Sequence, residues 1–115
     1  MIEGFYRIAF TGASGSGFGI LVFSNGLIVG ADAAGAIYNG AYTGNSPDQS
    51  IRFTVTMNAP AGVTPVQTGI PLASQLNLPI SGALSENDIK SENTILLQTP
   101  IGPVNIIFKK LRNFK

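Results

Sequence analysis

The side chains that most often carry enzyme chemistry are scarce in this chain of 115 residues. It has no histidine and no cysteine, which excludes a Ser–His–Asp triad, a cysteine nucleophile and thiolate metal sites. Paired carboxylates could still act as general acid and base. However, Glu86, Asp88 and Glu92 lie in one polar stretch, which we interpret as solvated surface. We therefore predict that the protein is not an enzyme.

Asp32 has the most distinctive position among the six acids. It ends the apolar run 27–31 and is followed by two alanines and a glycine. Two interpretations stay open at this stage. The side chain is either a structural turn carboxylate that accepts backbone N–H bonds, or a group that contacts a ligand.

A glycine-rich stretch follows the apolar run 8–10 and at first suggests a dinucleotide-binding loop. In that motif the glycines lead into a helix whose N-terminus meets a pyrophosphate. Here Gly19 is followed by Ile-Leu-Val-Phe, which is typical of a strand, and the glycine spacing differs by a residue. No lysine follows Gly17, so a phosphate loop is excluded as well. We interpret 12–17 as a flexible link between strands and predict no cofactor.

Charge gives no indication of a nucleic-acid partner. The net charge is +1, and 11% of the residues are charged, against about 25% in a typical soluble domain. Four of the seven basic residues lie in 109–115, where solvated edge protection of a last strand explains them better than phosphate binding. So few charges suggest that a second copy or a partner covers part of the surface.

The sequence also gives no indication of a membrane partner. The apolar run 18–23 is far shorter than the ~20 residues of a membrane helix, and no signal peptide is visible at the start. We therefore expect a cytoplasmic protein that binds neither membranes nor nucleic acid directly.

Apolar residues recur at every second position along most of the chain, which predicts strands. The stretch 51–58 shows this alternation most clearly, and similar runs return about every ten residues. Asn25-Gly26 predicts a type I′ hairpin turn, because both positions need a positive φ. The predicted strands are 6–11, 18–23, 27–32, 36–42, 51–58, 76–80, 94–99 and 104–111.

These elements predict one all-β domain over residues 1–115. Short strands joined by hairpins are typical of an antiparallel barrel or sandwich. We favour an up-and-down β-barrel of about eight strands, because glycines within strands (Gly19, Gly30 and Gly40) suit the tight coiling that closure requires. Pro79 marks an edge or a bulge, and 86–92 a polar turn or a short helix.

Ordered motifs in the first half resemble the GrlR-like family, small bacterial negative regulators of type III secretion genes. The resemblance rests on Gly4–Phe10, Gly17–Leu21, Asn25–Asp32 and Tyr38–Tyr42. It implies an eight-stranded, lipocalin-like (calycin-like) barrel that forms a homodimer. It also implies binding to a transcriptional activator, which is thereby kept off DNA.

Two binding functions are compatible with these observations. The leading hypothesis is a dimeric regulatory module that contacts a transcriptional regulator through the loop residues Asn45, Ser46, Pro47, Asp48 and Gln49. The alternative is a barrel that holds a small hydrophobic ligand. Its cavity would be lined by aromatic side chains, namely Tyr6, Phe10, Phe18, Tyr38, Tyr42, Phe53 and Phe108. The sequence leaves open whether these rings surround a hollow or fill it.

Overall fold

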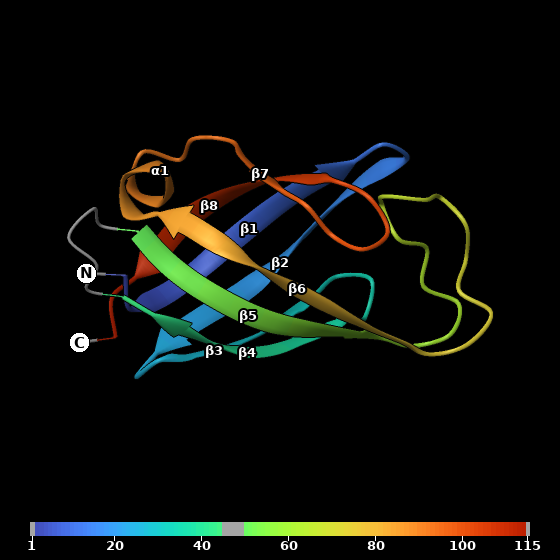
Figure 1. Cartoon of the computed structure of the whole chain (residues 1–115), viewed down its shortest axis with the longest axis horizontal. Helices are drawn as coiled ribbons and strands as arrows, with labels where there is room; N and C mark the ends of the chain where they lie inside the picture. The colour runs from blue at the N-terminus through green and yellow to red at the C-terminus, as the bar shows by residue number, and fades with distance from the viewer. Residues whose placement is uncertain (1, 45–49, 115) are drawn as a thin grey trace.

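The computed structural model describes residues 2–44 and 50–114. These residues form eight strands and one short helix (Figure 1). The elements are β1 (Gly4–Gly12), β2 (Gly15–Ser24), β3 (Leu27–Asp32), β4 (Ile37–Thr43), β5 (Ser50–Ala59), β6 (Leu76–Ser85), α1 (Glu86–Lys90), β7 (Ile95–Leu97) and β8 (Val104–Arg112). No helix in this part of the chain has the length and apolar composition needed to cross a membrane.

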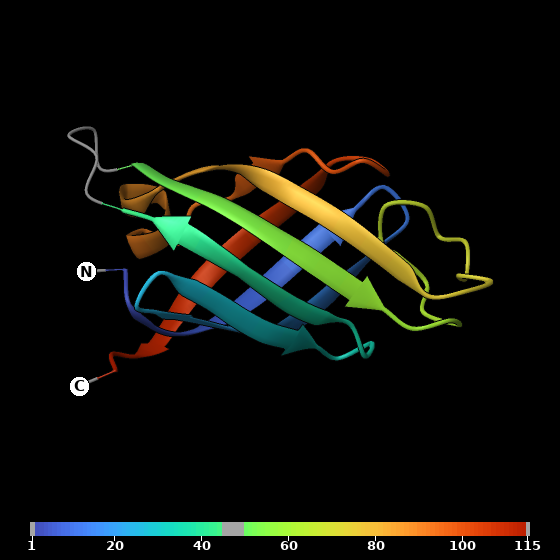
Figure 2. The same ribbon diagram turned by 60° about the horizontal axis from the view of Figure 1, so that its bottom comes forward.

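The strands form one antiparallel sheet in the order β6-β5-β4-β3-β2-β1-β8-β7. Consecutive strands are therefore neighbours in the sheet, except β6 and β7, which lie at its two ends. β8 returns to pair with β1. The sheet coils into a nearly closed barrel whose two unpaired edges belong to β6 and β7 (Figure 2). Helix α1 contacts both β6 and β8. The predicted all-β, up-and-down barrel is confirmed.

Alternation along each strand decides which side chains enter the barrel. On β5, Ile51, Phe53, Val55, Met57 and Ala59 are buried, whereas the intervening residues are exposed or half-buried. The other strands repeat this arrangement because successive side chains of a strand point to opposite faces. The period of two that predicts the strands therefore also defines the core.

Glycines allow neighbouring strands to approach closely where the sheet coils. A Cβ atom on Gly30 of β3 would lie 2.1 Å from the carbonyl oxygen of Ile20 on β2. A Cβ atom on Gly40 of β4 would lie 2.1 Å from the carbonyl oxygen of Thr54 on β5. Both oxygens belong to hydrogen-bonded strands, so neither can move aside easily. The tight coiling predicted from these glycines has this steric basis.

One half of the barrel, next to α1, is filled by aromatic rings. Tyr6, Phe23, Tyr42 and Phe108 form an aromatic cluster with edge-to-face contacts and ring centroids 5.3–6.2 Å apart. Such contacts add about 0.5–1.5 kcal/mol each beyond the burial of their surface. Ile89 of α1 is buried against this cluster and completes the packed end.

A cover segment, residues 60–75 between β5 and β6, lies at the opposite end of the barrel (Figure 1). The Ser14 backbone N–H donates to the Val66 carbonyl oxygen at 2.8 Å. The Gln67 amide donates to the Thr99 hydroxyl at 3.4 Å. The cover segment is thereby held against the β1–β2 turn and the connection between β7 and β8.

The stretch 12–17 is not the flexible link that its glycines predict. β1 continues to Gly12 and β2 begins at Gly15, so the turn has only two residues. A Cβ atom on Gly12 would lie 2.5 Å from the Val66 carbonyl oxygen. These glycines lie within strands, and Gly12 makes room for the cover segment to pass close by.

Three local predictions are confirmed. Pro79 lies on β6, an edge strand, where its missing N–H need not serve a second neighbour. Asn25 and Gly26 have φ values of 49° and 79°, as the type I′ turn requires. The polar stretch after β6 contains α1, whose first turn is capped by the Ser85 hydroxyl accepting from the Asp88 N–H.

Substitution of Gly40 by alanine tests the steric basis of the coiling. We expect Gly40→Ala to lower the free energy of unfolding by about 1–3 kcal/mol, because the new methyl group meets backbone that cannot retreat. Gly82→Ala on β6 is the matched control, since its Cβ would lie 3.4 Å from the nearest atom. Urea denaturation of both variants measures the difference, and equal effects would contradict the steric explanation.

Candidate ligand-binding cavity

A cavity of about 480 Å³ lies inside the barrel, between the aromatic cluster and the cover segment. Small-molecule sites in proteins have volumes of roughly 300–1,000 Å³. All eight described strands contribute lining residues, as do residues 63–67 of the cover segment. The interior is therefore filled at one end and hollow at the other.

The cavity wall is mainly apolar. Aliphatic side chains from strands all around the barrel contribute to it, among them Ile8, Leu21, Val55, Ile80, Leu97 and Val104. Exposed residues at its rim mark the mouth, which lies between β2, the β3–β4 turn and the cover segment. An apolar molecule entering here would exchange water for hydrocarbon on most sides.

Five of the seven aromatic residues predicted to line a cavity do so. They are Phe10, Tyr38, Phe53 and Phe108 on the wall, and Phe18 at the rim, where its side chain is 62% exposed. The other two, Tyr6 and Tyr42, belong to the aromatic cluster instead and are not among the lining residues. The alternation of apolar residues predicts the face of the strand on which a ring lies. The position of that ring along the barrel axis depends on how the strands are paired in register. Both tyrosines lie at the α1 end, where the rings fill the width of the barrel.

Sequence reasoning missed the aliphatic lining and the cover segment. The aliphatic residues carry a usable signal, because Val55 and Met57 alternate in step with Phe53. The cover segment carries none, since residues 60–75 show no strand or helix period. Its contribution to the cavity depends on contacts between parts of the chain that are distant in sequence.

Asp32 is the main polar feature of the cavity. One carboxylate oxygen, Oδ1, accepts the backbone N–H groups of Ala34 at 3.0 Å and Ala36 at 3.1 Å. The other oxygen, Oδ2, accepts the Tyr38 hydroxyl at 2.6 Å. The carboxylate thus binds the backbone of the β3–β4 turn and also lies on the cavity wall.

The Tyr38 hydroxyl is held in its protonated form. Burial raises its pKa well above the usual value, and the hydrogen bond to Asp32 and the negative charge of that residue raise it further. A protonated hydroxyl can donate to the carboxylate while its own oxygen still accepts. The pair therefore presents hydrogen-bond acceptors at the mouth end of an apolar cavity.

Two further kinds of site can be compared with the sequence predictions: metal sites and the partner-binding loop. Across residues 2–44 and 50–114, no group of three acidic side chains is placed to hold a metal ion. The predicted partner-binding residues, Asn45–Gln49, lie outside the residues that the structure describes.

The outer surface of β2, β3 and β4 has a second feature, which we name the apolar face. It consists of Phe18, Ile20, Leu27, Val29 and Ile37, whose side chains are 42–62% exposed. Strand pairing brings these positions together across neighbouring strands. None of the described outward-facing residues of the three strands is charged. The face is therefore a continuous uncharged surface.

Comparison with known proteins gives no relative for this chain: no protein-family model, no curated protein and no solved structure matches it. The resemblance of residues 4–42 to the GrlR-like family stays a prediction. Functional inference therefore depends on the cavity and the apolar face.

The three tyrosines predict a loss of stability at alkaline pH. Burial raises the pKa of Tyr6 from 10.0 to about 12, and the charges of Glu86 and Tyr42 contribute. The pKa values of Tyr38 and Tyr42 are raised as well. The unfolded chain therefore loses these protons at lower pH than the folded chain. The stabilisation that protonated Tyr6 contributes is complete below pH 10 and is lost as the pH rises through about 12.

Urea denaturation across this pH range, with tyrosinate absorbance of the folded protein, measures the effect. We expect the free energy of unfolding to fall by about 1.4 kcal/mol per pH unit for each tyrosine that stays protonated. Tyr6→Phe should remove its share of this slope. Titration of all three tyrosines at their ordinary pKa in the folded protein would contradict the prediction.

Proposed function

We propose that this protein is a non-enzymatic binding protein whose barrel holds one small hydrophobic ligand. The observation that carries the proposal is the apolar cavity of about 480 Å³. An eight-stranded barrel can fill its interior with side chains, so a hollow of this size is not a consequence of strand number. Apolar cavities of about 150 Å³ already bind benzene, and this volume is about three times larger.

The arrangement of the barrel supports this proposal. The aromatic cluster and α1 fill one end of the barrel, and exposed lining residues lie at the other end, beside the cover segment. Hydrogen bonds from the β1–β2 turn and to Thr99 hold this segment over the cavity. A rigid wall with a separately attached cover allows entry without opening of the sheet.

A bulky side chain inside the cavity should block binding. Ile80 of β6 lines the cavity, whereas the next residue, Ser81, is exposed. We expect Ile80→Trp to weaken binding of a neutral fluorescent naphthylamine probe at least about tenfold, because the ring occupies ligand volume. Ser81→Trp places the same ring outside and should leave affinity unchanged. Equal affinity in both folded variants would place the probe elsewhere.

The apolar face favours a second function, association with a copy of the same chain. Continuous exposed apolar surface on a small protein is typical of surface that another protein covers. A homodimer is also what the resemblance to the GrlR-like family implies. On this proposal the dimer is cytoplasmic and binds a transcriptional activator, acting as a negative regulator of type III secretion genes. Contact through Asn45–Gln49 belongs to the same proposal.

Light scattering coupled to size-exclusion chromatography tests the association. We expect the wild-type protein to elute as a dimer. Val29→Lys should produce a monomer, because a charge near the centre of the apolar face loses its hydration when the face is covered. Thr54→Lys on the outer face of β5 is the control and should remain dimeric. A monomeric wild-type protein at high concentration would contradict the proposal.

A further inference from the structure

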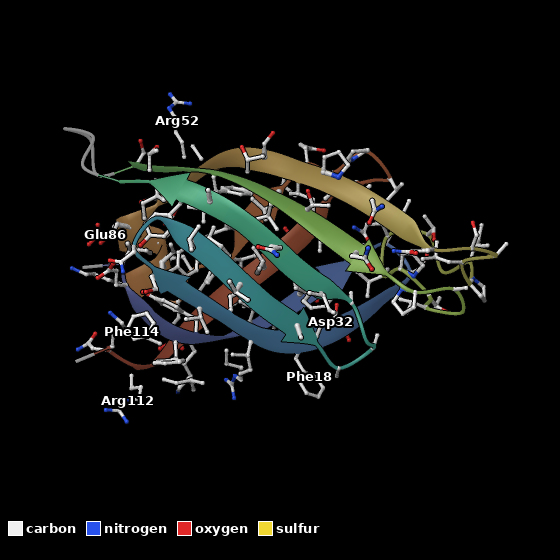
Figure 3. All side chains as sticks on the ribbon, turned by 90° about the horizontal axis from the view of Figure 1, so that it is seen from below. Phe18, Asp32, Arg52, Glu86, Arg112 and Phe114 are labelled. Atoms are coloured by element: carbon white, nitrogen blue, oxygen red, sulfur yellow. The ribbon has the colours of Figure 1, made fainter. Side chains whose placement is uncertain are left out.

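The charge distribution on the cavity wall indicates which head group the ligand carries, an inference that rests on the proposed ligand binding. Asp32 is the only charged residue among the described lining residues. The other polar side chains, from Ser16, Tyr38, Thr64 and Gln67, are neutral. Figure 3 shows Asp32 near Phe18, whereas Arg52 and Arg112 lie toward the α1 end. No lysine or arginine of the lining balances the carboxylate.

The carboxylate of Asp32 has a remaining acceptor position. It accepts three hydrogen bonds, two at Oδ1 from backbone N–H groups and one at Oδ2 from Tyr38. A carboxylate has about four acceptor sites, so Oδ2 can take one further donor. The Tyr38 oxygen can accept beside it. Two acceptors therefore lie close together at one side of a mainly apolar cavity.

The sign of the charge distinguishes between ligand classes. On this half-buried wall, a negative head group would be repelled by Asp32 and would find no cation among the described lining residues. A positive head group would be attracted and could donate to Oδ2, and hydrogen bonds to charged groups are the stronger ones. We propose that the cavity selects an apolar molecule with a cationic, hydrogen-bond-donating head group, such as a primary ammonium, and rejects carboxylate head groups.

Three ligands with the same ten-carbon chain test this selectivity in the unmodified protein. Decylammonium, decanol and decanoate are titrated at neutral pH below their micellar concentrations. Calorimetry gives the affinities, and a change in tyrosine fluorescence accompanies binding near Tyr38, which lines the cavity in a chain without tryptophan. We expect decylammonium to bind most tightly, decanol less tightly, and decanoate at least about tenfold more weakly than decylammonium.

The three affinities distinguish failure of the head-group inference from failure of the proposed ligand binding. Equal affinities, or tightest binding of decanoate, would overturn the head-group inference and leave the proposed ligand binding intact. Absence of binding by all three ligands would overturn the inference together with the proposed function.

Variants identify the residue that causes the selectivity. Asp32→Asn keeps the size of the side chain and an oxygen for the backbone N–H groups, but it removes the charge. We expect the difference between decylammonium and decanoate to shrink to about threefold or less. Glu92→Gln removes one exposed acid and is the control for net charge, so its selectivity should equal that of the wild type. A folded Asp32→Asn protein with unchanged selectivity would overturn the assignment to Asp32.

A second variant keeps the test valid if Asp32→Asn does not fold. Tyr38→Phe retains the carboxylate and frees one of its acceptor sites. We expect this protein to keep its preference for decylammonium over decanoate. Loss of the preference in folded Tyr38→Phe would overturn the role of the carboxylate as the selecting group.

Discussion

Close approach between neighbouring strands is the constraint on which the barrel depends. Eight described strands surround one interior only because the sheet coils strongly, and coiling brings backbone carbonyls of one strand over residues of the next. Gly30 and Gly40 occupy inward positions where this happens, and no other residue type fits without displacement of backbone. The same glycines contribute no side chain to the interior. Closure and incomplete filling of the barrel are therefore connected.

The division of the barrel into a packed and a hollow half follows from where large rings lie along its axis. Tyr6, Phe23, Tyr42 and Phe108 meet next to α1 and supply the dense contacts of the core. A second, smaller buried cluster, with Met57, Ala59 and Leu78, packs against the cover segment, and the cavity lies between the two packed regions. Binding sites built on such a scaffold are rigid, because the wall belongs to hydrogen-bonded strands.

The fold was largely predictable, because alternation and turn chemistry are local. Inward residues such as Phe53 and the Asn25-Gly26 turn can be assigned from a few neighbours in the sequence. The site was predictable only in part. Four of the predicted aromatic residues lie on the cavity wall and Phe18 lies at its rim, but the depth of Tyr6 and Tyr42 depends on register across several strands. The position of the cover segment depends on hydrogen bonds and on apolar packing of Val63 and Leu72 against distant residues, for which the sequence has no period.

Asp32 binds the backbone of the β3–β4 turn and also lies on the cavity wall, and its negative charge bears on which ligand fits there. Two backbone N–H groups and a tyrosine hydroxyl surround the carboxylate, which suffices to hold a short turn. A neutral asparagine could accept from the same N–H groups and is common in turns, so capping alone does not require a negative charge. A charge on a mostly apolar wall has a desolvation cost, which hydrogen bonds reduce and an opposite charge offsets more fully. The described lining supplies no cation, so the proposed cationic ligand would offset this cost.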